Sequence, residues 1–397
     1  MDREENIFDN TQIAFEYKND DELKKAIWIF RLIGYPWLVR LGSRLTLWAV
    51  ENKLPVRWVL KNTLFSQFCG GENLQETLQT VEKIYRYNVE SILDYGVEGK
   101  QVEEEFDRTA SEIKKNILLS KQNKAIPFAV FKPTGLIRFS LLEKLNTREK
   151  LSKEEEDEWT RARERFISVC KYAYENNVSV FVDAEESWIQ TPVDNLVEEC
   201  MLMFNKSKPV VYNTLQMYRT DRLDYLKQSI EWAKRNNIYY GVKLVRGAYM
   251  EKERERAEKL GYKSPIHPFK EATDNAFNQA LHICVENRDV VAVCNATHNE
   301  KSCLLLIELM KKNNVDKQDP NFYFAQLYGM SDHISFNLAD RQYRVAKYLP
   351  YGPVEDVVPY LIRRAQENTS VAGQQSRELS LLLKEWKRRK QTRNKHK

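Results

Sequence analysis

The stretch that decides the fold is residues 209–245, PVVYNTLQMYRTDRLDYLKQSIEWAKRNNIYYGVKLV. It begins and ends with apolar runs, at 209–217 and 238–245, and an amphipathic segment at 221–236 separates them. Near-continuous apolar runs are typical of parallel strands buried on both faces, and helical crossovers connect such strands. The stretch therefore predicts a strand–helix–strand unit.

The same alternation recurs along the chain from about residue 88. Eight apolar runs can be counted, at 89–95, 126–132, 178–183, 209–217, 238–245, 290–296, 322–328 and 343–349. Eight β/α units over about 250 residues match the size of a TIM barrel. An open doubly wound sheet is the alternative, but the sequence contains neither GxGxxG nor GxxxxGK[ST]. We therefore predict an α/β protein with a (β/α)8 TIM-type barrel.

Residues 21–68, ahead of the barrel, have the pattern of helices. Four tryptophans stand among their lysines and arginines: Trp28, Trp37, Trp48 and Trp58. We expect these side chains to pack in the core of a helical N-terminal region. A face that lies on a membrane surface is the alternative, because amphipathic helices with Trp and Lys/Arg can lie in the bilayer interface.

The basic residues gather at the end of the chain, where KRRKQTRNKHK (387–397) holds seven Lys/Arg and no acid. The net charge is +5, so removing those seven charges leaves the rest of the chain at −2. The charge therefore does not indicate a nucleic-acid-binding body. We predict a helical region at 1–87, the barrel at 88–386 and a disordered basic tail at 387–397.

Composition points to a globular protein, with 42% apolar and 30% charged residues. Six scattered cysteines without a CxxC pair fit reduced thiols, and the five histidines lie too far apart for an HExxH metal site. The acidic start is neither a signal nor a transit peptide, and no apolar run approaches the ~18–20 residues that span a bilayer. These features predict a cytoplasmic protein, at most peripheral at the inner face of a membrane.

The stretch 351–368, YGPVEDVVPYLIRRAQEN, predicts a helix with two different faces. One face is apolar, and the other carries Tyr360, Arg363, Arg364 and Glu367 at i, i+3, i+4 and i+7. A solvated helix face would explain this pattern. A carboxylate or phosphate clamp is the alternative, because guanidinium groups match such anions bidentately.

Polar side chains follow the predicted strands at their carboxyl ends, where a TIM barrel carries its chemistry. They are Asp94, Glu98, Lys132, Asp183, Gln216, Lys243, Arg246, Thr297 and His298. His298 by itself is also compatible with a hydrogen-bonded structural histidine. Lys243 lies among apolar neighbours, so its charge requires a nearby anion or cofactor dipole.

Several of these segments together resemble the motifs of the proline dehydrogenase family. They are GVKLVRGAY (241–249), VDAEE (182–186), NATHN (295–299), LYGM (327–330), PYLIRRAQEN (359–368), VESILDYGVEG, FAVFKPTG and FSQFCGGE. The resemblance covers about residues 37–375. It implies a distorted (β/α)8 barrel with non-covalent FAD at the strand carboxyl ends. It also implies oxidation of L-proline to Δ1-pyrroline-5-carboxylate, with electrons passed to a membrane quinone.

The resemblance assigns roles to residues of this chain. The implied substrate-binding residues are Lys132, Arg363, Arg364, Tyr360, Leu327, Ser335 and Glu98. Arg363, Arg364 and Lys132 would hold the proline carboxylate, Tyr360 and Leu327 would flank its ring, and Glu98 would pair with one arginine. The implied flavin-contacting residues are Val182, Gln216, Lys243, Val245, Arg246, Gly247, Ala248, Tyr249, Thr297, His298 and Glu367. Lys243, in a network with Asp183, would stabilise charge beside flavin N5.

Two departures from the family pattern keep alternatives open. Lys243 stands where many members have arginine, and Ser335 is aligned where many bacterial members have tyrosine. A smaller residue leaves room for a ring hydroxyl, so 4-hydroxyproline remains an alternative substrate. A non-enzymatic membrane- or nucleic-acid-binding protein is the alternative of another class, but it leaves the strand-end residues unexplained.

Overall fold

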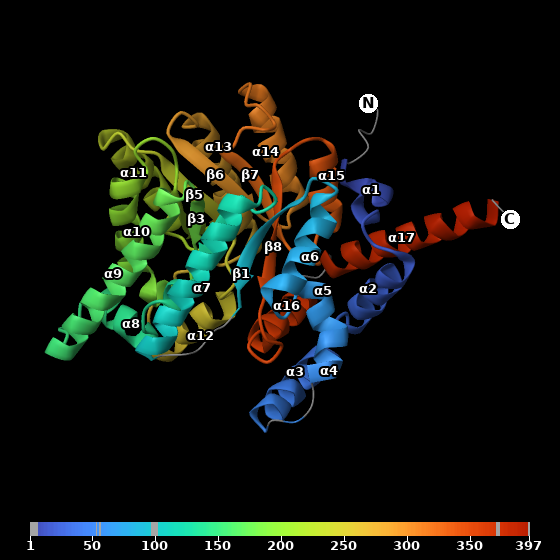
Figure 1. Ribbon diagram of the computed structural model, residues 1–397, viewed down its shortest axis with the longest axis horizontal. Helices are drawn as coiled ribbons and strands as arrows, with labels where there is room; N and C mark the ends of the chain where they lie inside the picture. Colours follow the sequence, from blue (N-terminus) through green and yellow to red (C-terminus); the bar gives the residue numbers. More distant parts are fainter. Residues whose placement is uncertain (1–6, 53, 55–56, 97–101, 371–373, 396–397) are drawn as a thin grey trace. The chain divides into compact units, whose positions relative to one another are not determined.

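The computed structural model describes residues 7–52, 54, 57–96, 102–370 and 374–395. Its eight strands form one closed barrel in the order β1 to β8 (Figure 1). They are β1 (Glu90–Tyr95), β2 (Phe128–Phe131), β3 (Ser179–Val182), β4 (Val211–Gln216), β5 (Tyr240–Val245), β6 (Val291–Ala296), β7 (Phe322–Leu327) and β8 (Val345–Tyr351). Seven predicted apolar runs each contain one strand, and the eighth, 343–349, overlaps β8, which ends two residues later, so the TIM-type (β/α)8 prediction is confirmed.

By its internal contacts the chain divides into two compact units. The first unit contains Met1–Val97 and Gln326–Lys397, and the second contains Glu98–Ala325. Thus β1 and β8 belong to the first unit, where they pair in parallel from Glu90–Ala346 to Tyr95–Tyr351. The second unit contains β2 to β6, and its neighbouring strands are also parallel.

In the second unit, helices alternate with the strands (Figure 1). They are α7 (Glu103–Gln122), α8 (Phe139–Thr147), α9 (Lys153–Glu175), α10 (Gln190–Phe204), α11 (Arg222–Arg235), α12 (Met250–Leu260), α13 (Lys270–Glu286) and α14 (Glu300–Lys312), with short helices η3 (Pro133–Gly135) and η4 (Ser187–Ile189). A capping box begins α9, because Ser152 and Glu155 each bond the other's backbone N–H. The predicted helices at 153–176 and 221–236 are therefore confirmed.

The first unit is built from both ends of the chain. Its helices are η1 (Ile7–Asp9), α1 (Thr11–Phe15), α2 (Asp20–Leu32), α3 (Pro36–Glu51), α4 (Arg57–Leu60), η2 (Lys61–Phe65), α5 (Ser66–Phe68), α6 (Leu74–Tyr85), α15 (Asp332–Asp340), α16 (Val358–Ser370) and α17 (Gln374–Lys395). Helices α1 and α2 pack on α17, and α3 packs on α16. One apolar cluster joins α2 to the apolar face of α16, including Phe30, Phe68, Val357 and Leu361.

The basic tail differs from the prediction, because α17 extends through it to Lys395. Arg389 bonds Glu385 within the helix, donates to the carbonyl oxygens of Phe15 and Lys18, and pairs with Asp20 at 3.0 Å. These contacts order the tail and neutralise part of its charge. The disordered-tail prediction is therefore wrong for the described part of the tail.

The tryptophans of the N-terminal helices also differ from the prediction. Trp28, Trp37, Trp48 and Trp58 are 51%, 61%, 57% and 74% exposed. Core packing is therefore the wrong interpretation for these side chains. No helix among the described residues combines the length and the apolar character needed to cross a membrane. All six cysteines are buried free thiols.

A buried charge network ties both ends of the chain to α15. The carboxylate of Asp332 accepts a hydrogen bond from Tyr17 at 2.7 Å and pairs with Lys347 at 2.9 Å and Lys18 at 3.7 Å. Glu378 of α17 accepts from the backbone N–H of Ser331, next to Asp332. Burial alone would raise the pKa of Asp332, but Lys347, Lys18 and the Tyr17 hydroxyl lower it to about 2. The network therefore favours the ionised carboxylate.

We expect Asp332→Asn to lower the free energy of unfolding at neutral pH by about 3–5 kcal/mol, because it leaves Lys347 and Lys18 without a buried anion. The folded pKa lies below the ordinary value of 3.8, so the carboxylate's stabilisation is complete above about pH 4 and is lost as the pH falls toward 2. Thermal unfolding of both proteins from pH 7 downward checks this. A stability difference that does not shrink below about pH 4 would contradict it.

Candidate active site

Lys243 and Asp183 form a buried ion pair at the ends of β5 and β3. The ammonium Nζ of Lys243 donates to Oδ1 of Asp183, and the two side chains are only 5% and 16% exposed. The same Nζ lies 5.5 Å from the centroid of the Phe181 ring. Asp183 therefore supplies an anion for the strand-buried lysine, and both charges are held within the second unit.

Glu185 connects the ends of three strands in the second unit. Its carboxylate accepts from the Thr134 N–H at 3.1 Å and from the Thr134 hydroxyl at 2.6 Å, just after β2. Its backbone carbonyl accepts from Gln216 Nε2 at 2.6 Å, at the end of β4. Burial raises the pKa of the Glu185 carboxyl to about 7, although the Thr134 bonds oppose the shift. The bonds of Glu185 could not be predicted from the sequence, because its partners lie far away in the chain.

Glu185→Gln tests whether burial raises the pKa of the Glu185 carboxyl, because a side-chain amide can bond both Thr134 groups without ever carrying a charge. The folded pKa of about 7 exceeds the ordinary 4.5, so the stability from the neutral form is present below about pH 4 and is lost as the pH rises through 7. We expect the wild type to lose about 3 kcal/mol relative to the variant between about pH 5 and pH 8. Thermal unfolding of both proteins measures this. Parallel pH curves would contradict the prediction.

The guanidinium of Arg246 is directed at the helices outside the barrel. It donates to Asp274 of α13 at 2.7 Å, to the Thr297 hydroxyl at 2.5 Å and to Ser302 of α14 at 3.0 Å, and it stacks on Phe277. Arg246 therefore positions Thr297. His298 follows Thr297 and is half-buried.

The loop between β5 and α12 follows the carboxyl end of β5, and at Gly247 no side chain covers its backbone. Gly247 has a φ of +127°, and a Cβ there would lie 2.6 Å from the Tyr218 ring, so glycine is required. Neither Gly247 nor Ala248 donates its backbone N–H to another described residue. Ser187 N and Oγ each donate to Glu253 at 2.6 Å and hold α12 in place.

The residues at these strand ends fit a flavin dinucleotide. A buried ammonium (Lys243), a buried amide (Gln216) and a buried hydroxyl (Thr297) lie at neighbouring strand ends. The two available backbone N–H groups stand at the start of α12, a position that suits phosphate oxygens. Val182, Val245 and Tyr249 complete the predicted flavin set within the same unit, and Val182 is fully buried.

The first unit contains the arginine pair. Arg364 of α16 is 7% exposed, and its guanidinium lies 5.4 Å from the Tyr360 ring centroid. Arg363 is half-buried. Leu327, at the end of β7, packs with Tyr360 against the same apolar cluster. Arg364, Tyr360 and Leu327 therefore lie around one apolar cluster, and the solvated-face interpretation does not fit Arg364.

The remaining predicted site residues lie elsewhere. Ser335 is fully buried within α15, and its hydroxyl donates to Gln326 Oε1 at 2.8 Å. This geometry favours helix packing over contact with a substrate. Lys132 is half-buried directly after β2. Glu98 and the side chain of Glu367 lie outside the described residues.

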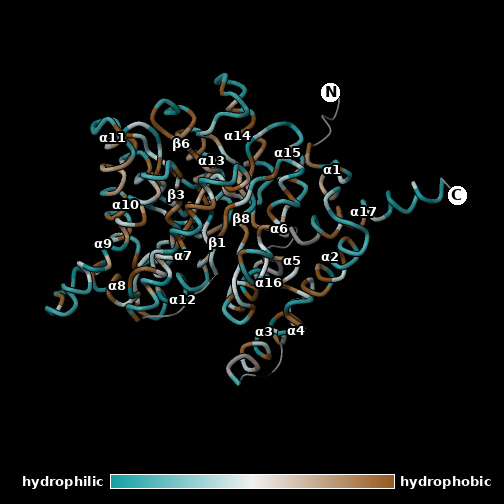
Figure 2. Tube along the Cα trace, viewed as in Figure 1, coloured by the Kyte–Doolittle hydropathy of each residue, from teal (hydrophilic) through white to brown (hydrophobic). Residues whose placement is uncertain are grey.

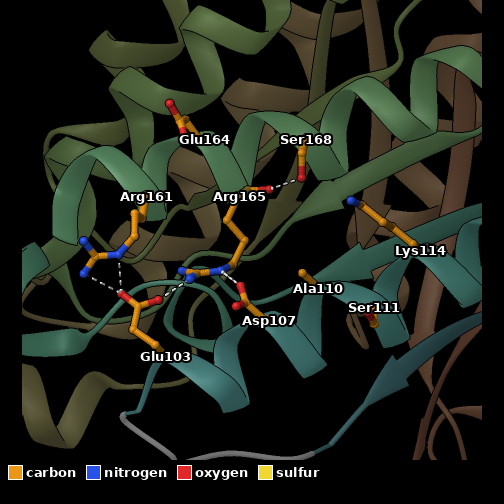
Figure 3. Close-up of a pocket in the computed structure, with 9 residues that line it drawn as sticks. All are labelled: Glu103, Asp107, Ala110, Ser111, Lys114, Arg161, Glu164, Arg165 and Ser168. Atoms are coloured by element: carbon orange, nitrogen blue, oxygen red, sulfur yellow. Dashed lines mark hydrogen bonds and ion pairs between the residues drawn. The ribbon is translucent and has the colours of Figure 1, made fainter. Parts of the chain in front are cut away.

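A separate cavity of about 500 Å³ lies between α7 and α9 (Figure 3). Arg165 donates there to Asp107 at 2.7 Å, to Glu103 and to the Leu136 carbonyl at 2.8 Å, and Arg161 also pairs with Glu103. Carboxylates already pair with these arginines, so the residues that line the cavity have a structural role. Through its bond to the Leu136 carbonyl, Arg165 holds the segment after β2 against α7 and α9. No sequence pattern indicates these ion pairs, because the paired residues are up to 62 positions apart.

The comparisons with known proteins agree with this geometry. The proline dehydrogenase family model matches residues 77–377. The chain belongs to the proline dehydrogenase family. A relative named proline dehydrogenase 1, mitochondrial, from Dictyostelium discoideum is 34% identical over 84% of this chain and 66% of its own length. A relative named hydroxyproline dehydrogenase from Xenopus laevis is 30% identical over 95% of this chain and 89% of its own.

The proline dehydrogenase fold also recurs in solved structures. Proline utilization A from Bdellovibrio bacteriovorus superimposes with a TM-score of 0.70 over 95% of this chain, at 20% identity. The match covers 39% of that longer protein, so this chain spans about two fifths of its length. At this identity the likeness supports the barrel fold alone.

Proposed function

We propose that the chain oxidises L-proline to Δ1-pyrroline-5-carboxylate, with non-covalently bound FAD as the hydride acceptor. The observation that carries this proposal is membership of the proline dehydrogenase family over residues 77–377, which include every predicted site residue. The strand-end residues of the second unit support it, because a buried ammonium, amide and hydroxyl lie at neighbouring strand ends there.

Substrate binding is assigned to α16. Arg363 and Arg364 hold the proline carboxylate through charge-assisted bonds, with Lys132 as a third cation, and Tyr360 and Leu327 supply apolar surface to the ring. Glu98 pairs with one of the arginines. Each charge-assisted bond contributes about 1.5–3 kcal/mol to binding.

Cofactor binding is assigned to the second unit. Gln216, Thr297, His298 and the Val245–Tyr249 loop hold the flavin, together with Glu367. When bound, FAD accepts the hydride from the substrate carbon. Lys243, oriented by Asp183, then stabilises the negative charge that accompanies the transfer. The protein's contribution is orientation and a preorganised cation.

Oxidation of 4-hydroxyproline by the same chemistry is the second candidate. The Xenopus relative named hydroxyproline dehydrogenase favours it. Ser335 does not, because the structure buries it and engages its hydroxyl with Gln326. Proline is therefore the first choice.

A quinone is the proposed electron acceptor, and the proposed location is the cytoplasm at the inner face of a membrane. Relatives such as the Dictyostelium protein are named as mitochondrial, so their names do not support this location. The relative rates at which a soluble quinone and oxygen reoxidise the proline-reduced enzyme test the acceptor. Fractionation of cells that produce the protein tests the location.

An anaerobic spectrum tests the main proposal. The purified protein should carry the visible flavin absorption band, and L-proline should bleach it. A parallel titration with 4-hydroxyproline decides between the two substrates. Protein that takes up no FAD, or a flavin band that neither imino acid bleaches, would refute the proposal.

A further inference from the structure

Helices α3 and α4 expose a row of large apolar side chains to solvent. Trp37, Leu41, Leu45 and Trp48 of α3 are each about half exposed or more, and Trp58 of α4 is the most exposed of this group. Hydrophobic residues recur along both helices (Figure 2). Contiguous apolar patches of this kind are uncommon on monomeric soluble proteins and mark interaction surfaces.

The spacing of the row places it on one side of α3. Positions 37, 41, 45 and 48 are related by i, i+4, i+8 and i+11, so they share a face of the helix. Among the side chains of α3 that the structure describes, Val39 and Ala49 are buried, and the helix packs on α16 of the same unit. Helix α3 is therefore apolar on both sides, and only one side is covered by the protein.

Positive charge predominates along α3. Residues 23–50 contain five Lys/Arg and no Asp or Glu, and the one acid of α3 is its last residue, Glu51. Arg40 and Arg44 flank the exposed row, and neither pairs with a carboxylate among the described residues. By contrast, Arg57 and Lys61 nearby already pair with Glu72. The available positive charge is therefore beside the α3 row.

We propose that the exposed face of α3, extended by Trp58, docks into the headgroup region of an anionic lipid bilayer. Tryptophan suits that region because it combines an apolar ring with a polar N–H, and arginine can reach the lipid phosphates from the edge of the row. The tail is less suited to this role, because α17 uses Arg388 and Arg389 in ion pairs within the unit.

Docking through α3 would also affect the position of α16, the helix on which α3 packs. Helix α16, which carries Arg363 and Arg364, packs directly on α3 within the first unit. Docking through α3 therefore brings the arginine helix close to the membrane, where a lipid-dissolved electron acceptor resides. The docking itself does not depend on the proposed oxidation, and it can be tested without turnover.

Vesicle co-sedimentation of the full chain tests the proposal. We expect binding to vesicles that contain phosphatidylglycerol and little binding to phosphatidylcholine alone. Trp37→Gln/Leu41→Gln/Trp48→Gln should lower the partition coefficient by at least about tenfold. The matched control is Leu260→Gln/Phe269→Gln, which changes side chains that are 57% and 60% exposed in the second unit and should leave binding unchanged.

A second set of variants tests the contribution of positive charge to vesicle binding. Arg40→Gln/Arg44→Gln should lower binding to the anionic vesicles by about tenfold or more and weaken its salt dependence. Lys387→Gln/Lys390→Gln, which neutralises exposed tail residues, should change binding by less than about threefold. Circular dichroism and thermal unfolding confirm that each variant is folded.

Three outcomes would overturn the proposal. The first is no binding to either vesicle type. The second is binding that the tail variant abolishes and the α3 variants leave intact. The third is a chain that self-associates in light scattering through α3 and binds no vesicles, which would make this face a contact between copies. Quenching of tryptophan fluorescence by headgroup-level nitroxide lipids, lost in the α3 variant alone, would support it.

Discussion

Replacing Arg364 by alanine is expected to weaken proline binding by about 10- to 100-fold. A charge-assisted bond to a carboxylate contributes about 1.5–3 kcal/mol, which corresponds to about 10- to 100-fold in the dissociation constant. Arg364 is also the more buried of the pair and stacks on Tyr360. Anaerobic titration of the flavin band with proline gives the dissociation constant.

The control for Arg364→Ala is Arg235→Ala, at the exposed end of α11, which should bind proline like the wild type. Flavin content and the thermal midpoint separate lost binding from lost folding. A folded, flavin-loaded Arg364→Ala protein that binds proline within about twofold of the wild type would remove α16 from the substrate site. The α3 docking proposal would survive that result, because it depends on vesicle binding.

Replacing Lys243 by methionine is expected to lower the free energy of unfolding by about 3–5 kcal/mol and to slow flavin reduction by about 10²–10³-fold. The stability loss follows because Asp183 keeps its charge without its buried partner. The rate loss follows because a preorganised cation beside the reacting centre disappears. Thermal unfolding and stopped-flow reduction of the flavin measure the two effects separately.

The double variant Lys243→Met/Asp183→Asn distinguishes structure from catalysis. Removing both charges should restore most of the stability, because no uncompensated charge remains. It should not restore the reduction rate. Lys234→Met, which removes an exposed lysine paired with Glu231 on α11, is the neutral control. Recovery of the rate in the double variant would show that Lys243 serves only to neutralise Asp183.

The barrel could be predicted because its signals are local. Runs such as PVVYNTLQM and IYYGVKLV are rich in apolar residues, and the helices between the strands begin with signals such as the Ser152–Glu155 capping box. The need of Lys243 for an anion was also evident, because apolar neighbours surround it in sequence. Its partner Asp183 is 60 residues away and was indicated only by the family resemblance.

The rest required the tertiary structure. The periodicity of α3 is the same whether its tryptophans face a core or solvent, since apolar residues lie on more than one side of the helix. From the sequence, the charged end of α17 resembles a solvated tail. Only the structure shows that Arg389 bonds Asp20 and the carbonyl oxygens of Phe15 and Lys18. The Arg165 bonds and the Glu185 bonds likewise join segments that no local pattern connects.

The packing of α1 and α2 on α17 has a consequence for biosynthesis. During translation the first helices leave the ribosome long before α17, on which they pack, has been made. Contacts of such large sequence separation form late and slowly. The apolar N-terminal segments must therefore wait uncovered until synthesis is almost complete, and a nascent chain stalled before α16 should depend on chaperones to stay unaggregated.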